Sequence, residues 1–160
     1  MKIKLYPISL LFLLTISSCA PVKYIKSTKH ADKKEMKSFL KGLEEVSLSK
    51  HYTLLMDYMD SEYIDRAHEI ESNGDDLIFI DEIFTGYDIH TKTYHCIHQK
   101  DIISFETLQV IQLNTDLYKA KFKIGDTHSL IECDIFIKKS TDQGKTKFGI
   151  LGDNSKLAKI

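Results

Sequence analysis

The apolar positions of the chain change their spacing at about Gly86. Before this residue they recur every three or four positions, as on one face of an amphipathic helix. This spacing predicts helices over 32–48, from 49 to about 59 and, after an interruption at 60–62, from about 63 to 71, and a short last helix that ends at Gly86. Ser49 offers the N-cap of the second helix, and Asn73-Gly74 offers a turn before the last one.

After Gly86 the apolar residues alternate with polar ones, which is the spacing of a half-buried β-strand. The alternation is regular over 118–124, where lysines occupy the polar positions, and over 131–138. Less regular segments over 87–98, 102–113 and 145–151 predict three further strands. Short breaks join them, so we expect antiparallel hairpins. Helices followed by strands predict an α+β fold, with amino-terminal helices packed on a curved antiparallel sheet of about four to six strands.

The first residues have the layout of a secretory signal peptide. Lys2 and Lys4 precede an uncharged, mostly apolar run that extends from Leu5 to Ser18. This run is shorter than the roughly 20 residues that a membrane-spanning helix needs, and it contains Pro7. A positive start followed by a short apolar segment is typical of an export signal that is later removed.

The end of this segment, Ile16-Ser17-Ser18-Cys19, resembles the lipobox of bacterial lipoproteins. The resemblance implies that the chain is cut before Cys19 and that a lipid on the Cys19 sulfur holds the protein on a membrane. The alternative is an ordinary signal peptide with a chance cysteine. Ala20 stands where an aspartate retains lipoproteins in the inner membrane of enteric bacteria, so the outer membrane of a bacterial cell envelope is favoured.

The chain after the cut divides into a tether and one domain. Residues 20–31 place lysines among Ser, Thr and Pro with no apolar period, which indicates a solvated linker. Residues 32–160 are then a single domain. Removal of Lys2 and Lys4 lowers the basic residues from 22 to 20, against 23 acidic residues, a net charge of −3. This balance gives no support to nucleic-acid binding.

The order of elements resembles the nuclear-transport-factor-2-like cone fold, and more narrowly the small secreted lipoproteins of that fold in Bacteroidetes. The resemblance rests on helical segments with aromatic residues over 57–63 and 79–86, followed by a strand meander, and it covers about 35–152. It contains no diagnostic motif. Members of this superfamily include enzymes, transport adaptors and binding modules, so the resemblance does not choose a function.

The cone fold implies a pocket between helices and sheet, in which enzymes of the superfamily place Asp, His or Tyr. The candidates that the resemblance gives in this chain are Tyr52, Tyr58, His68, Phe84, Tyr94 and Phe122. Asp57 is a further acid–base candidate. The alternative is that these aromatic residues belong to the core. The sequence contains no serine-nucleophile, phosphate-loop or zinc-protease motif.

Cysteines and histidines are the candidates for a disulfide or a metal site. Cys96 and Cys133 fall on the first and fourth predicted strands, so buried thiols are favoured over a disulfide. On a single strand His90, Cys96 and His98 would share one face, with His95 on the other, which would allow a zinc site. Partly exposed histidines are the simpler interpretation, and we expect no metal and no cofactor.

The outer face of the predicted sheet offers a second kind of site. If alternate residues of 131–137 face the helices, Leu130 and Phe136 face outward. Two apolar residues on an open face indicate a surface for a homodimer or a protein partner, although isolated exposed apolar residues are common.

With its lipobox and without a catalytic motif, the sequence favours a non-enzymatic envelope lipoprotein that binds a small apolar molecule or a protein. The alternative is an enzyme that uses the cone pocket for acid–base chemistry on a small substrate.

Overall fold

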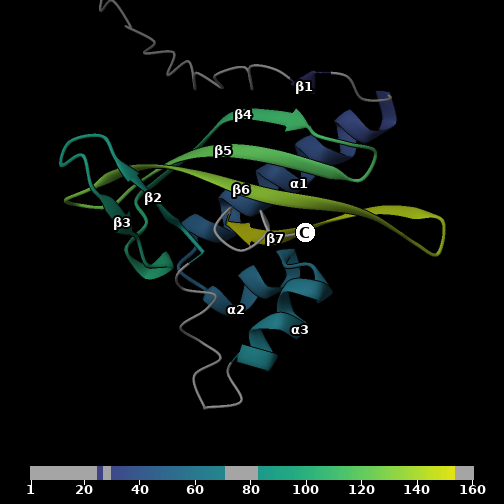
Figure 1. Cartoon of the computed structure of the whole chain (residues 1–160), viewed down its shortest axis with the longest axis horizontal. Helices are drawn as coiled ribbons and strands as arrows, with labels where there is room; N and C mark the ends of the chain where they lie inside the picture. The colour runs from purple at the N-terminus through teal and green to yellow at the C-terminus, as the bar shows by residue number, and fades with distance from the viewer. Residues whose placement is uncertain (1–24, 27–29, 71–82, 154–160) are drawn as a thin grey trace, which may run out of the picture.

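The computed structural model describes residues 25–26, 30–70 and 83–153 (Figure 1). The elements of the first half are β1 (Ile25–Lys26), α1 (His30–Leu48), α2 (Tyr52–Leu55), the 3-10 turn η1 (Met56–Tyr58) and α3 (Ser61–Ile70). Those of the second half are β2 (Thr85–Asp88), β3 (Tyr94–Cys96), the 3-10 turn η2 (Gln99–Asp101), β4 (Ser104–Gln112), β5 (Leu117–Gly125), β6 (Leu130–Asp142) and β7 (Lys145–Asp153). Within these residues, no helix combines the length and the apolar character needed to cross a membrane.

All seven strands belong to one sheet, in the order β1-β4-β5-β6-β2-β3, with β7 also beside β6. β6 has 13 residues and pairs with two strands along the same edge. It pairs with β2 near its start, where Ile131 is opposite Asp88, and with β7 from Ile135 onward. The six strands from β2 to β7 pair antiparallel, and β1 pairs with β4 in parallel. The predicted α+β fold, with helices against an antiparallel sheet, is confirmed.

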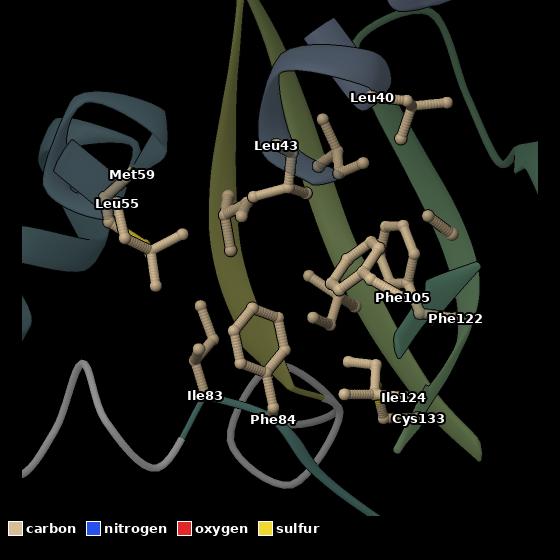
Figure 2. Packing of buried hydrophobic residues seen from close by; sticks show 14 of the residues in the cluster. Leu40, Leu43, Leu55, Met59, Ile83, Phe84, Phe105, Phe122, Ile124 and Cys133 are labelled. Atoms are coloured by element: carbon tan, nitrogen blue, oxygen red, sulfur yellow. The ribbon is translucent and has the colours of Figure 1, made fainter. Parts of the chain in front are cut away.

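The inner face of the sheet is apolar at its centre and is covered by α1 (Figure 1). β5 and β6 alternate as predicted, and their buried residues are Tyr118, Ala120, Phe122, Ile124, Ile131, Cys133, Ile135 and Ile137. α1 contributes Met36, Leu40 and Leu43 from its predicted apolar stripe. Figure 2 shows Leu40 and Leu43 pointing from α1 toward the strands. The helix is therefore held on the sheet by apolar burial.

Aromatic rings fill the part of the core next to β2. The ring of Phe105 on β4 lies 5.7 Å from that of Phe84, edge to face, and 5.0 Å from that of Phe122 (Figure 2). Ile83 and Phe84 are both buried. These contacts join the chain that enters β2 to the centre of the sheet.

The second helix begins later than predicted and is short. Ser49 does not cap it, because its hydroxyl donates to the carbonyl oxygen of Val46 at 2.7 Å and so closes α1. α2 has four residues and begins at Tyr52. The third predicted helix is α3, and Asp60 caps it by accepting the backbone N–H of Glu62 at 3.0 Å.

The segment 85–98 forms a hairpin, whereas the sequence predicts a helix end at Gly86 and one strand over 87–98. Gly86 lies inside β2. A Cβ atom there would fall on the carbonyl oxygen of Glu132 and would lie 2.9 Å from the Cβ of Cys133. Glycine is required because β2 approaches β6 this closely. The remainder of the last predicted helix, including Leu77 and Ile80, lies outside the described residues.

One strand comes from the segment predicted as a tether. Ile25 and Lys26 pair in parallel with Val110 and Ile111 of β4. The six antiparallel strands fall within the predicted four to six, and β1 adds a parallel seventh strand that the sequence did not predict. α1 begins at His30, two residues before the predicted start. Two residues are too few to show a period in the sequence. The predicted signal peptide and Cys19 lie outside the described residues.

An ion pair with little exposure joins α1 to the sheet. Nζ of Lys139 on β6 donates to Oδ2 of Asp32 at 2.9 Å, and the two side chains are 18% and 12% exposed. The hydrogen bond to Asp32 is the main cause that raises the pKa of Lys139. Burial, followed by the charge of Asp32, raises the pKa of Tyr118, whose ring is buried beside this pair. Lys139 and Tyr118 are thus both protonated at neutral pH. The ion pair between Lys139 and Asp32 holds the first turn of α1 on the sheet.

We predict that Asp32→Asn lowers the free energy of unfolding by about 1.5–3 kcal/mol, because the Lys139 ammonium loses its charged partner where water has little access. Glu45→Gln is the matched control on the same helix. It removes an ion pair with Lys41 whose side chains are 66% and 78% exposed, and it should cost less than about 0.5 kcal/mol. Urea unfolding of the two variants measures the difference, and equal losses would contradict the prediction.

The raised pKa of Lys139 also sets the direction of a pH effect. Its contribution to stability is present below the ordinary lysine pKa of 10.5 and is lost as the pH rises through the higher value of the folded state. The stability difference between Asp32→Asn and the unchanged protein should therefore shrink in strongly alkaline solution.

Candidate interaction surface

Two tyrosine rings stand on the outer face of the sheet, at the β2–β3 hairpin. Tyr87 is opposite Tyr94 on β3 and opposite Glu132 on β6, whose neighbours Ile131 and Cys133 point into the core. The two rings meet edge to face with centroids 5.7 Å apart, a geometry that aromatic pairs favour. Tyr94 is 77% exposed and Tyr87 is 41% exposed, so both are open to solvent.

A third apolar residue extends this surface into the loop that follows β2. Ile89 is 40% exposed, although its backbone N–H donates to the carbonyl oxygen of Leu130 at 3.1 Å and so ties the loop to β6. We call Tyr87, Ile89 and Tyr94 the hairpin surface. Its three side chains are exposed while the backbone below them is hydrogen-bonded.

Asp88 fixes the loop that carries the hairpin surface. Its Oδ1 accepts the backbone N–H of His90 at 2.7 Å and that of Thr91 at 2.9 Å. Its backbone N–H donates to the carbonyl oxygen of Thr93 at 2.8 Å, and its own carbonyl oxygen accepts the N–H of Lys92 at 3.0 Å. An aspartate that bonds backbone groups two and three residues ahead is a typical turn former. The rings of Tyr87 and Tyr94 are thus presented on a loop of defined shape.

The Asp88 side chain is fully buried, yet its pKa is lowered below the ordinary value of 3.8. The largest cause is the hydrogen bond from the backbone N–H of Thr91. Burial acts in the opposite direction, and hydrogen bonds from the backbone of His90 and Leu130 and from the hydroxyl of Ser129 lower the pKa further. Asp88 is therefore a carboxylate at neutral pH, and the Oδ1 atom of this carboxylate is bonded by the loop that it organises.

The centre of the outer face carries charged residues that pair with one another. Nζ of Lys119 lies 2.6 Å from Oδ2 of Asp134, and Nζ of Lys121 lies 3.1 Å from Oε2 of Glu132. These side chains are between 29% and 41% exposed, and their charges offset one another. Exposed apolar side chains lie on either side of this charged centre, at the hairpin surface and along β4.

Several predicted pocket residues are placed apart from one another. Phe84 and Phe122 are fully buried and belong to the core, so the core interpretation holds for both. Tyr94 stands on the outer face, on the opposite side of the sheet from the core. The prediction that these three residues line one pocket is wrong, because strand parity sends Tyr94 outward and Phe122 inward.

The other pocket candidates come from the helical half. Tyr58 is half-buried, with its ring 5.4 Å from that of Phe39, and Asp57 beside it is exposed. The side chains of Tyr52 and His68 lie outside the described residues. Tyr58 therefore packs against α1 as part of the margin of the core.

The predicted partner residues of β6 are less accessible than the sequence implies. Phe136 is only 8% exposed, and Leu130 is half-buried. Phe136 is opposite Gly152 on β7, and the ring of Tyr63 lies against Gly152, so α3 lies beside this end of the sheet. The prediction of Phe136 as part of an open surface is wrong, because a helix covers this corner.

The predicted zinc face does not form. The chain reverses between β2 and β3, so His90 lies in the loop while Cys96 lies on the returning strand. Within the described residues, no three His, Cys, Asp or Glu side chains are grouped closely enough to hold a metal ion. Cys96 and Cys133 are thiols rather than a disulfide, and β2 lies between their strands. Cys133 is buried and Cys96 is half-buried.

Sequence reasoning identified Tyr94 but assigned it to a pocket, and it missed Tyr87, Asp88 and Ile89 altogether. A signal was present in the segment Asp88-Ile-His-Thr, which recurs in the similar segment Asp126-Thr-His-Ser. In both, Oδ1 of the aspartate accepts the backbone N–H groups two and three residues ahead. Two turns of this kind, rather than one long strand, would have predicted the hairpin.

Comparison with known proteins adds no assignment: no protein-family model matches the chain, and neither curated proteins nor solved structures give a match.

We predict that Asp88→Asn destabilises the domain at neutral pH and has a smaller effect in acid. A lowered pKa in the folded state gives stability that is present above the ordinary value of 3.8 and is lost as the pH falls through the folded-state value. Urea unfolding of both proteins at neutral pH, and again in acid below the folded-state pKa of Asp88, measures the loss of stability under each condition. Asp142→Asn, at an exposed position of the β6–β7 turn, is the control. A loss for Asp88→Asn that does not depend on pH would contradict the assigned role.

Proposed function

We propose that the protein is a lipid-anchored lipoprotein of the bacterial cell envelope and that its domain is a non-enzymatic binding module. The anchor is supported by the order of three sequence features: Lys2 and Lys4, a short apolar run, and Ile16-Ser17-Ser18-Cys19. Ala20 after the cysteine favours the outer membrane. The lipid attaches through the sulfur of Cys19, with the acyl chains as the membrane partner.

We further propose that the domain has the nuclear-transport-factor-2-like cone architecture. This proposal is supported by helices that precede the six antiparallel strands and by α1, which covers one face of their sheet. Register irregularities in β4, between Thr107 and Gln109, and in β7, opposite Phe136 and Ile137, are further support, because such bulges bend a sheet.

The hairpin surface is the observation that carries the binding role. Tyr94 is 77% exposed, so much of the apolar area of its ring is in contact with water unless a partner covers it. Tyrosine is enriched among the residues that dominate protein interfaces, and a loop fixed in advance by Asp88 reduces the ordering cost of association. A protein partner fits this surface better than a small apolar molecule, because the rings stand on an open sheet face.

Acid–base catalysis is less well supported. Among the described residues, the acid–base and pocket candidates Asp57, Tyr58 and Tyr94 are distributed over the helical half and the outer face. A general acid–base pair needs both groups within hydrogen-bonding reach of one substrate.

The anchor is tested by replacing its cysteine. Cys19→Ala should abolish metabolic labelling of the protein with an alkynyl fatty acid and should release the domain from the membrane fraction, because no sulfur is left to carry the lipid. Cys96→Ala is the matched control and should retain both labelling and membrane association. Continued labelling of Cys19→Ala would exclude the proposed anchor.

The binding role is tested by photo-crosslinking in cells. A photoreactive benzoylphenylalanine in place of Tyr94 should give a discrete adduct on irradiation, and the same group at exposed Asp142 should not. Adding Tyr87→Ala should remove the adduct, because the facing ring is part of the same surface. An adduct of twice the mass of the protein would identify a second copy as the partner. Adducts of equal yield from both positions would exclude the hairpin surface as the binding site.

A further inference from the structure

The pairing of β1 with β4 limits how far the domain can stand from a membrane. Cys19 precedes Ile25 by six residues, which span at most about 20–22 Å when fully extended. Ile25 is opposite Val110, so the β4 edge of the sheet can lie no farther than this distance from the lipid on Cys19. Without this pairing the limit would apply to the start of α1 at His30, eleven residues from Cys19, and would be about 36–40 Å. β1 therefore shortens the effective tether to roughly half.

The β4 edge carries exposed apolar side chains next to this attachment point. Ile111, the register partner of Lys26, is 37% exposed, and Leu113 just beyond β4 is 49% exposed. Ile103, just before β4, is 56% exposed. Because the pairing is parallel, the start of β1 is directed toward the Ile103 end of β4. We call these three residues the β4-edge surface.

The charge of this strand is compatible with contact to lipid. β4 carries one charged residue, Glu106, in its nine residues. Edge strands that face water are commonly protected by several charges or by proline. β4 has neither protection, and within the described residues β1 pairs with only Val110 and Ile111 of it. An edge that lies on a membrane surface has less need of such charges, because the bilayer excludes other strands from it.

From the reach of the tether and the position of these side chains, we infer that the domain stands on the bilayer through its β4-edge surface, with Ile103, Ile111 and Leu113 in contact with the lipid. This inference rests on the proposed lipid anchor at Cys19. β3 is then the edge farthest from the lipid, four strand spacings or about 19 Å from β4. The orientation directs the hairpin surface away from the membrane, where a protein partner can approach it.

A tryptophan reporter tests this orientation, because the chain contains no tryptophan of its own. The lipidated protein, cut before Cys19, is reconstituted into phosphatidylcholine vesicles with ordinary or with brominated acyl chains, and the brominated chains quench nearby tryptophan. Leu113→Trp should lose fluorescence in the brominated vesicles and shift its emission to the blue. Tyr94→Trp is the matched control at the opposite edge, is also exposed, and should not change. Ile103→Trp gives a second reporter on the β4-edge surface.

Vesicle flotation separates this inference from the anchor. Protein that does not float with the vesicles would overturn the proposed anchor itself. Protein that floats, while neither Leu113→Trp nor Ile103→Trp is quenched, would overturn the orientation and leave the anchor standing. Equal quenching at Leu113 and Tyr94 would also overturn it, because the domain would then lie flat or tumble.

Two matched insertions test the role of β1. A flexible insertion of about ten Gly and Ser residues lengthens the reach by about 33–36 Å. Placed between Pro21 and Val22, it lengthens the path from lipid to β4 and should reduce quenching of Leu113→Trp. Placed between Ser27 and Thr28, it leaves that path unchanged and should preserve quenching. Equal effects of the two insertions would show that β1 does not set the reach.

Discussion

The inner face of β5 and β6 is the surface on which the rest of the domain packs. Its side chains are almost completely buried, and the alternate residues on the same strands are charged or half-exposed, apart from Phe136. A slip of one residue would bury Lys121 and Asp134 and expose Phe122 and Ile135, so apolar burial fixes the register strongly. That register in turn places Glu132 on the outer face. Tyr87 is opposite Glu132, so the position of the hairpin surface follows from packing on the other side of the sheet.

The elements that sequence reasoning predicted well are those in which one period persists. The stripe of α1 and the alternation of β5 each cover enough residues for the period to be clear, and in both the apolar positions of the pattern are buried or half-buried. The alternation of β6 also indicates on which side of the sheet Lys139 lies. Lys139 has the same parity as Ile135 and Ile137, so it points inward, and an inward lysine requires a buried acid such as Asp32. The predicted pattern thus contained an ion pair that the sequence alone did not lead us to propose.

The features that were missed depend on contacts between distant segments. β1 is defined by two residues that pair with a strand far along the chain, and nothing in its own composition indicates this. Phe136 faces outward by parity, but α3 lies beside its register partner Gly152, and a single-sequence pattern carries no information about that approach. The sequence did not indicate the hairpin surface, for a different reason. The turn after Asp88 lacks glycine and places Lys92 in the left-handed conformation with φ of 58°, so the usual turn signal is absent.

The order of the elements also has a consequence for the time course of folding. α1 lies near the start of the chain, and the face that it covers is made by strands near the end. Most of the stability of a helix in a protein comes from the packing of its apolar face, so α1 is fully stabilised only when the last strands have paired. During synthesis from the amino terminus, the apolar stripe of α1 therefore remains exposed to solvent until most of the chain has been made. This delay exposes the apolar stripe of α1 to aggregation and to chaperones until the sheet has formed.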